Sequence, residues 1–131
     1  MIYLDNAATT KVAPEVIEAM SSFMKSNYGN PSSKYYNQAE DAKQILQKSR
    51  RNIADFINAK EDEIIFTSGS TESNNFILKG LWEKTNKNHI ITTKVEHKSI
   101  LKACEYVEEK GCNVTYLDVN KNGNIEPEKI K

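Results

Sequence analysis

Three short groups of polar residues have the types and spacing that a binding site needs, and the first lies at residues 67–71. Its sequence is Thr67-Ser68-Gly69-Ser70-Thr71, and it separates an apolar run from a helical pattern. A helix N-terminus presents unpaired N–H groups and partial positive charge, and a glycine lets an anion approach them. The Ser70 and Thr71 hydroxyls add two donors, which indicates a phosphate cradle. The run matches neither GxxxxGK[ST] nor GxGxxG, and N-capping by these hydroxyls is the alternative.

The second group is Glu96-His97, which stands at the start of another helical pattern. Ligands of α/β proteins bind at the carboxyl ends of parallel strands, so we expect His97 at the same sheet edge as Ser70 and Thr71. There a flat imidazole can stack on an aromatic cofactor or carry a proton. The alternative is a surface histidine near a helix start.

The third group is the segment of residues 5–10, where short polar and very small residues follow an apolar run. Residues of the size of Asn6 and Ala7 let the backbone pass close to a ligand. A turn-forming arm without a ligand is the alternative interpretation.

Apolar periodicity indicates the elements that must position these groups. We expect helices over residues 14–26, 37–57, 71–84 and 98–110, and the first turn of another at 125–130. We expect strands over residues 63–67, 89–92 and 113–117, with a brief strand or extended arm at 2–4. Strands that alternate with helices are typical of βαβ units and a parallel sheet, so the predicted fold class is α/β.

The same pattern predicts how the chain is organised. Residues 1–60 form an N-terminal arm and helices, and residues 61–131 form a first βαβαβ part, together one truncated domain. Three parallel strands leave an open sheet edge, which proteins normally cover or pair. One or two helical turns at 125–130 are not stable alone. We therefore expect a fragment, or a chain that a partner completes.

Composition excludes several classes of protein. The 131 residues include 18 Lys plus Arg and 18 Asp plus Glu, and this balance argues against nucleic-acid or anionic-membrane binding. No apolar run approaches the roughly 20 residues of a membrane helix, and the N-terminus lacks a signal-peptide pattern. Cys104 is expected to pack in a helix and Cys112 to be a loop thiol, because their spacing fits neither a disulfide framework nor a metal site. These features predict a cytoplasmic protein.

Four segments together resemble the amino-terminal third of the cysteine desulfurases, which are pyridoxal-phosphate enzymes of the class V aminotransferase group. The segments are Tyr3-Leu4-Asp5-Asn6-Ala7-Ala8-Thr9-Thr10, Gly29-Asn30-Pro31-Ser32-Ser33, Glu63-Ile64-Ile65-Phe66-Thr67-Ser68-Gly69-Ser70-Thr71-Glu72-Ser73-Asn74-Asn75 and Val95-Glu96-His97. Nearly the whole chain is covered. The resemblance implies part of the large domain of a fold-type-I pyridoxal-phosphate enzyme, with a mostly parallel sheet and flanking helices, incomplete as a standalone domain.

The resemblance also implies roles for the three groups. Ser70 and Thr71 would bind the phosphate of pyridoxal 5'-phosphate. His97 would be both cofactor-binding and catalytic, because it would stack on the pyridine ring and take part in proton transfers. Asn6 and Ala7 would lie near the substrate.

The implied reaction converts L-cysteine to L-alanine and leaves the sulfur as a persulfide on an enzyme cysteine. It would supply sulfur for iron–sulfur clusters or other thio-cofactors, through a sulfur-acceptor or scaffold protein, and the full-length enzyme would be a homodimer. The family's Schiff-base lysine and nucleophilic cysteine lie beyond the position that matches Lys131. Neither Cys104 nor Cys112 matches that cysteine, so we expect the chain to be inactive alone.

Two departures from the family pattern concern the loop after Ser33. Tyr35 stands where the family often has His, and Gln38 where Gly is common, so this loop is expected to pack or recognise partners differently. The alternatives are another class V enzyme, such as a transaminase or selenocysteine lyase, and a non-catalytic truncated or complementing subunit. A small phospholigand-binding α/β module is a third alternative.

Overall fold

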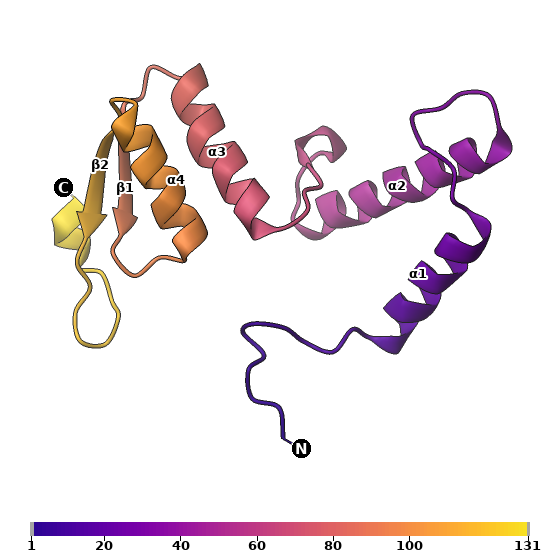
Figure 1. Cartoon of the computed structure of the whole chain (residues 1–131), viewed down its shortest axis with the longest axis horizontal. Coiled ribbons are helices and arrows are strands. Elements are labelled where there is room, and N and C mark those ends of the chain that lie inside the picture. Colours follow the sequence, from indigo (N-terminus) through magenta and orange to yellow (C-terminus); the bar gives the residue numbers. More distant parts are fainter. Residues whose placement is uncertain (1, 131) are drawn as a thin grey trace. The chain divides into compact units, whose positions relative to one another are not determined.

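The computed structural model describes residues 2–130, and the chain divides into two compact units, Met1–Ile65 and Phe66–Lys131. The first unit contains α1 (Pro14–Ser26), α2 (Asn37–Phe56) and the 3-10 helix η1 (Glu61–Glu63). The second contains α3 (Ser70–Lys84), β1 (His89–Thr93), α4 (Lys98–Glu109), β2 (Asn113–Leu117) and the 3-10 helix η2 (Pro127–Ile130) (Figure 1). Among the described residues, no helix has the length and apolar character that crossing a membrane requires.

In the first unit, the loop between the two helices folds back onto the start of α2. Gly29 lies so close to α2 that a Cβ there would be 2.2 Å from the backbone carbon and oxygen of Gln38. The backbone N–H of Asn30 donates to the hydroxyl of Tyr36 at 3.1 Å. Ala39, in the first turn of α2, is fully buried. Glycine is therefore required at position 29 for steric reasons.

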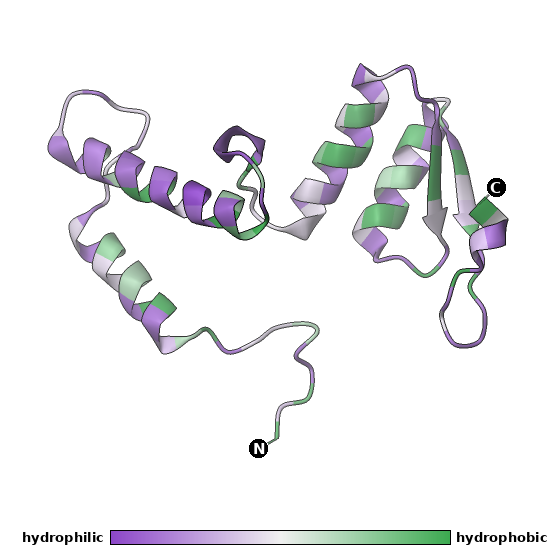
Figure 2. Cartoon of the chain, turned by 180° about the vertical axis from the view of Figure 1, so that it is seen from behind, coloured by the Kyte–Doolittle hydropathy of each residue, from purple (hydrophilic) through white to green (hydrophobic). Residues whose placement is uncertain are grey.

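The second unit is a partial α/β domain with a small parallel sheet. β1 and β2 pair in parallel, in a register that runs from His89 opposite Asn113 to Thr93 opposite Leu117. α4 connects the two strands and packs beside α3, and both helices carry apolar bands (Figure 2). The core consists of side chains from α4 and β2 with a few neighbours: Ala103, Cys104, Val107, Cys112 and Leu117. This core is small for the apolar content of the unit, whose α3 contributes no buried residue.

The predicted strand over residues 63–67 is wrong. Glu63 ends η1, and the following residues have no strand assignment, although Ile64 has extended backbone angles. Ile64 is buried and its carbonyl accepts a hydrogen bond from Arg50 of α2. Extended backbone becomes a strand only where another strand pairs with it. Within the described residues the sheet has two strands, where the sequence predicts three.

The arm at residues 2–4 also forms no strand. Tyr3 is exposed, and its hydroxyl donates to the carbonyl of Asp5 at 2.9 Å. The other predicted elements are present, with ends that differ by a few residues. The predicted helical turn near the C-terminus is the 3-10 helix η2.

Candidate functional site

The loop before α3 depends on the backbone of Gly69. This residue is the N-cap of α3 and has φ 158° and ψ −178°, a combination that is essentially restricted to glycine. A Cβ at Gly69 would meet nothing within 4 Å, so backbone conformation alone sets the requirement. The open space above Gly69 also leaves the helix N-terminus accessible.

The first turn of α3 holds this loop in place. The Glu72 carboxylate accepts hydrogen bonds from the backbone N–H of Ser68 at 2.6 Å and from its hydroxyl at 2.7 Å. These two bonds lower the pKa of Glu72. The hydroxyls of Thr67 and Ser73 share a further hydrogen bond of 2.8 Å. These hydrogen bonds shape the loop, and none of them involves the side-chain hydroxyls of Ser70 and Thr71.

Ser70 and Thr71 begin α3 and are both exposed. No side chain caps this helix, so N-capping by these hydroxyls, the alternative from the sequence, is not what the structure shows. Their hydroxyls and the first N–H groups of α3 all belong to one helix end, where the partial charge is positive. The arrangement can accept an anion with several oxygen atoms.

His97 is the N-cap of α4 and is exposed. Its Nδ1 accepts the backbone N–H of Ser99 at 3.1 Å and lies 2.8 Å from the Ser99 hydroxyl. A backbone N–H can only donate, so Nδ1 is the acceptor nitrogen of the neutral ring and Nε2 carries the proton. The ring is thus oriented by its own helix, with Nε2 as the nitrogen left for exchange.

Ser99 also links the two helix starts. Its hydroxyl accepts a hydrogen bond of 2.8 Å from the side-chain amide of Asn74, and Ser99 is only 8% exposed. The N-terminal parts of α3 and α4 therefore lie side by side, at the end of the unit where β1 and β2 end (Figures 1 and 2). This is the edge at which the sequence predicts Ser70, Thr71 and His97.

Asn6 and Ala7 lie in the first unit, in a turn closed by hydrogen bonds from the backbone N–H groups of Ala8 and Thr9 to the carbonyl of Asp5. All of these residues are exposed. Their proximity to a substrate stays a prediction from the resemblance.

The two cysteines are unsuited to nucleophilic chemistry as they stand. Cys104 is fully buried in α4, as predicted, and Cys112 lies in the loop between α4 and β2, also as predicted, although it is only 3% exposed. Burial raises the pKa of both thiols, and the adjacent Cys112 raises that of Cys104 further. A thiol is the weak form of the nucleophile. Within residues 2–130, no three His, Cys, Asp or Glu side chains come together as a metal site would require.

Glu72, Asn74 and Ser99 are the residues of this site that sequence reasoning missed. A carboxylate four residues after Ser68 is a local signal that could have indicated the first of them. The hydrogen bond between Asn74 and Ser99 joins residues 25 positions apart, so no local pattern announces it.

The comparisons with known proteins agree with the resemblance. The family model described as Aminotransferase class-V matches residues 2–131. Among curated relatives, cysteine desulfurase IscS of Dictyoglomus turgidum is 46% identical over 99% of this chain and 33% of its own length. The mitosomal cysteine desulfurase of Trachipleistophora hominis is also 46% identical, over 99% of this chain and 30% of its own.

Solved structures give the same result. A NifS-like protein superposes with a TM-score of 0.89 at 38% identity, over 95% of this chain and 35% of that chain. SspA, solved in complex with cysteine, has a TM-score of 0.86 at 39% identity, over 95% of this chain and 36% of its own. The chain therefore spans about a third of these relatives. Because the family model covers nearly every residue, the chain belongs to the class-V aminotransferases and is similar to the cysteine desulfurases among them.

Proposed function

We propose that this chain provides the phosphate cradle and the ring-contacting histidine of a pyridoxal-phosphate-dependent cysteine desulfurase. The reaction would convert L-cysteine to L-alanine and transfer the sulfur to an enzyme thiol. The observation that carries the proposal is the pairing of the two helix starts through Asn74 and Ser99, which gathers the Ser70 and Thr71 hydroxyls and His97 at one edge. The neighbour that was solved with cysteine supports cysteine as the substrate.

The residues at the start of α3 fit a phosphate monoester. The exposed Ser70 and Thr71 hydroxyls and the first N–H groups of the helix supply donors, and the space above Gly69 is open. The nearby Glu72 carboxylate would repel an anion, but two hydrogen bonds direct it to Ser68. The positive helix end and neutral donors therefore dominate the site.

His97 would orient the ring and move a proton. The Ser99 N–H holds its Nδ1, which orients the ring and leaves the Nε2–H as a donor. Pyridoxal phosphate, when bound, draws electrons from the bonds at the substrate α-carbon. Protons then have to be carried at that site, and the resemblance assigns that role to His97.

The chain alone is proposed to bind the cofactor without turning over. The resemblance assigns the Schiff-base lysine and the nucleophilic cysteine to the part of the relatives that lies beyond the matched third. The two thiols present here are buried, with raised pKa values. In the complete enzyme we place the activity in sulfur supply to iron–sulfur clusters or other thio-cofactors, in a cytoplasmic homodimer that hands sulfur to an acceptor or scaffold protein.

Titration with pyridoxal phosphate tests the cradle. Cofactor absorbance and phosphorus NMR should report saturable binding by the wild-type chain. Replacing Ser70→Ala and Thr71→Val should weaken that binding at least about tenfold, because hydrogen bonds to charged groups are worth about 1.5–3 kcal/mol each. Ser49→Ala is the matched control, since the Ser49 hydroxyl bonds its own helix in the first unit.

The result that would contradict the proposal is equal phosphate affinity in the double variant and the wild type. Production of alanine and sulfide by the isolated chain would contradict the predicted inactivity. Both assays use the 131-residue chain. The binding assay tests the phosphate cradle, and the product assay tests the predicted inactivity.

A further inference from the structure

Ser99 takes part in three hydrogen bonds near the start of α4, and two of them involve the ring of His97. Its backbone N–H donates to Nδ1 of His97 at 3.1 Å, and its hydroxyl oxygen lies 2.8 Å from the same nitrogen. The third bond comes from the side-chain amide of Asn74, which donates to the hydroxyl oxygen at 2.8 Å. Because Ser99 is only 8% exposed, little water competes with these partners.

The amide of Asn74 sets the direction of the Ser99 hydroxyl. An amide nitrogen can only donate, whereas a hydroxyl has one hydrogen to give and lone pairs that accept. Since the Ser99 oxygen accepts from Asn74, its hydrogen remains for the other neighbour within hydrogen-bond distance, which is Nδ1 of His97. The three side chains therefore form a directional chain of hydrogen bonds that runs from Asn74 through Ser99 to His97.

The hydroxyl is the closer of the two donors that Ser99 offers to Nδ1. The oxygen lies 2.8 Å from Nδ1 and the backbone nitrogen 3.1 Å. The contact is partly buried, where hydrogen bonds are stronger than in water. A His97 ring with its hydrogen on Nδ1 would oppose both donors at once and leave them without an acceptor. The chain of bonds therefore favours the ring with its hydrogen on Nε2.

The carboxylate beside His97 in the sequence does not reverse this preference. A carboxylate bound to Nδ1 would accept a hydrogen bond and so require the hydrogen on Nδ1, as in a catalytic triad. Glu96 instead accepts a hydrogen bond of 3.1 Å from the hydroxyl of Thr93, the last residue of β1. The hydrogen bonds to the His97 ring come from its own helix.

We propose that Ser99 is a positioning residue of the site, whose hydroxyl, directed by Asn74, keeps His97 in the tautomer with its hydrogen on Nε2. This ring offers a donor at the nitrogen that Ser99 does not contact. The partner of Nε2 is then an acceptor, such as a carboxylate or phenolate oxygen of a cofactor or substrate. The inference rests on the proposed function, because the donor matters only where His97 meets such a molecule. The tautomer itself can be measured without one.

A ¹⁵N NMR experiment on the histidine rings of the 131-residue chain, without cofactor, tests the inference. At alkaline pH an imidazole is ordinarily neutral, and its two nitrogen shifts report which one carries the hydrogen. The wild-type His97 should be predominantly the Nε2–H form. Ser99→Ala removes the hydroxyl and keeps the backbone N–H, so the ratio of Nε2–H to Nδ1–H should fall at least threefold. Ser99→Thr keeps a hydroxyl and should retain the wild-type ratio.

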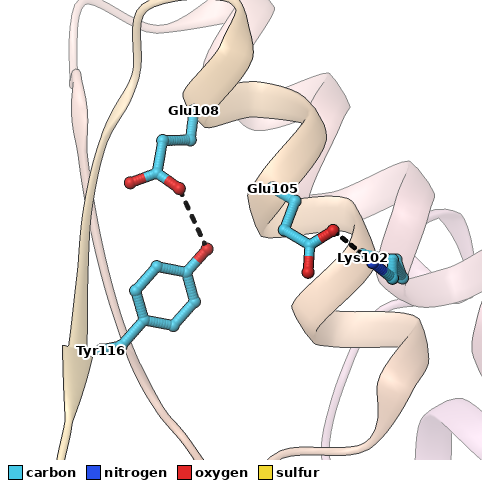
Figure 3. A network of polar contacts seen from close by, with 4 residues as sticks. All are labelled: Lys102, Glu105, Glu108 and Tyr116. Atoms are coloured by element: carbon cyan, nitrogen blue, oxygen red, sulfur yellow. Dashed lines mark hydrogen bonds and ion pairs between the residues drawn. The ribbon is translucent and has the colours of Figure 1, made fainter.

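Reversing the first hydrogen bond gives the sharper test. Asn74→Asp places an acceptor where the amide donates, so the Ser99 hydroxyl hydrogen should turn to the carboxylate and leave oxygen lone pairs facing Nδ1. The ratio should then fall further than in Ser99→Ala, although residues 74 and 99 remain bonded. A purely structural role of the bond predicts the opposite order. Lys102→Gln is the control, because it removes an exposed ion pair with Glu105 from the same helix (Figure 3).

A wild-type tautomer ratio in either Ser99→Ala or Asn74→Asp would overturn the inference, and so would a wild-type ring with its hydrogen on Nδ1. Circular dichroism confirms that each variant folds, and Asn74→Asp keeps the test decisive if Ser99→Ala does not. Pyridoxal-phosphate titration of the same samples reads the proposed function separately. Absence of cofactor binding by a wild-type chain with the expected tautomer would count against the proposed function alone.

Discussion

The side-chain amide of Asn74 donates a 2.8 Å hydrogen bond to the hydroxyl of Ser99 and so joins the N-terminal parts of α3 and α4. Ser99 also holds Nδ1 of His97 through its backbone N–H. One serine thus connects the helix that begins with Ser70 to the histidine that starts the next helix. The spacing between the proposed phosphate cradle and the proposed ring contact depends on this serine.

Removing the amide should separate the two helix starts. We expect Asn74→Ala to lower the free energy of unfolding by about 1 kcal/mol, the usual net value of such a bond, and to weaken cofactor binding. Urea unfolding and pyridoxal-phosphate titration measure the two effects. Asn52→Ala, an exposed position of α2, is the control. Unchanged cofactor affinity in Asn74→Ala would show that the spacing does not matter.

Two substitutions should separate the capping role of His97 from its ring. His97→Asn keeps a side-chain acceptor for the Ser99 N–H, so we expect wild-type stability with an altered spectrum of bound cofactor. His97→Phe keeps a flat ring but loses the cap, at a cost of about 1 kcal/mol. Its cofactor spectrum should stay close to that of the wild type. The reverse pattern of spectra would argue against ring stacking.

Alanine should have opposite effects at two glycines of the second unit. Gly69→Ala forces a Cβ into φ 158° and ψ −178°, which we expect to cost about 1–3 kcal/mol. Gly80 lies inside α3, where an added Cβ would meet nothing within 4 Å, so Gly80→Ala should stabilise by about 0.5–1 kcal/mol. Urea denaturation compares both variants with the wild type. Equal effects would mean that the Gly69 conformation carries no strain.

The loop before α3 should lose its order at acidic pH. The hydrogen bonds from Ser68 lower the pKa of Glu72 in the folded chain. The ionised Glu72 carboxylate therefore stabilises the folded loop fully at pH values above its unfolded-state pKa. This stabilisation is lost as the pH falls through the lower pKa of the folded state. The Ser68 amide shift in NMR should follow this transition, and in Glu72→Gln the transition should vanish. A Ser68 shift that titrates identically in both proteins would contradict the assignment.

Stability should fall at alkaline pH because of Tyr116. Burial first, and then the charge of Glu108, raises the pKa of Tyr116 to about 12. The protonated Tyr116 side chain contributes fully to the stability of the folded chain below the ordinary tyrosine pKa of about 10. This contribution is lost as the pH rises toward 12. The difference between wild type and Tyr116→Phe in tyrosinate absorbance measures the titration. Glu108→Gln should move it to lower pH, and no movement would exclude the charge effect.

The sequence predicts the helices and the strands β1 and β2 well, because their apolar periodicity is strong and their ends carry Pro14 or Gly111. It fails at residues 64–67, since an apolar run resembles a buried strand whether or not a partner strand exists. Ile65 is 61% exposed there. Cys112 lies in the loop that the sequence predicts, but its burial was not predictable, because it comes from packing across the unit.

The candidate site was predictable only in part. Ser70, Thr71 and His97 stand out because each follows a recognisable break in the apolar pattern. Glu72 and Ser99 act through hydrogen bonds to Ser68 and His97, and helix periodicity gives those residues no special place. Their roles become apparent only when the loop geometry and the distances between helices are known.

The apolar groove between α3 and the beginning of β1, which Ile77, Leu81 and Ile90 help to line, has a consequence for biosynthesis. The side chains of Ile77 and Leu81 are exposed and can associate with other apolar surfaces. Identical chains that emerge from neighbouring ribosomes expose the same residues. These exposed apolar side chains therefore favour association between copies where their local concentration is high.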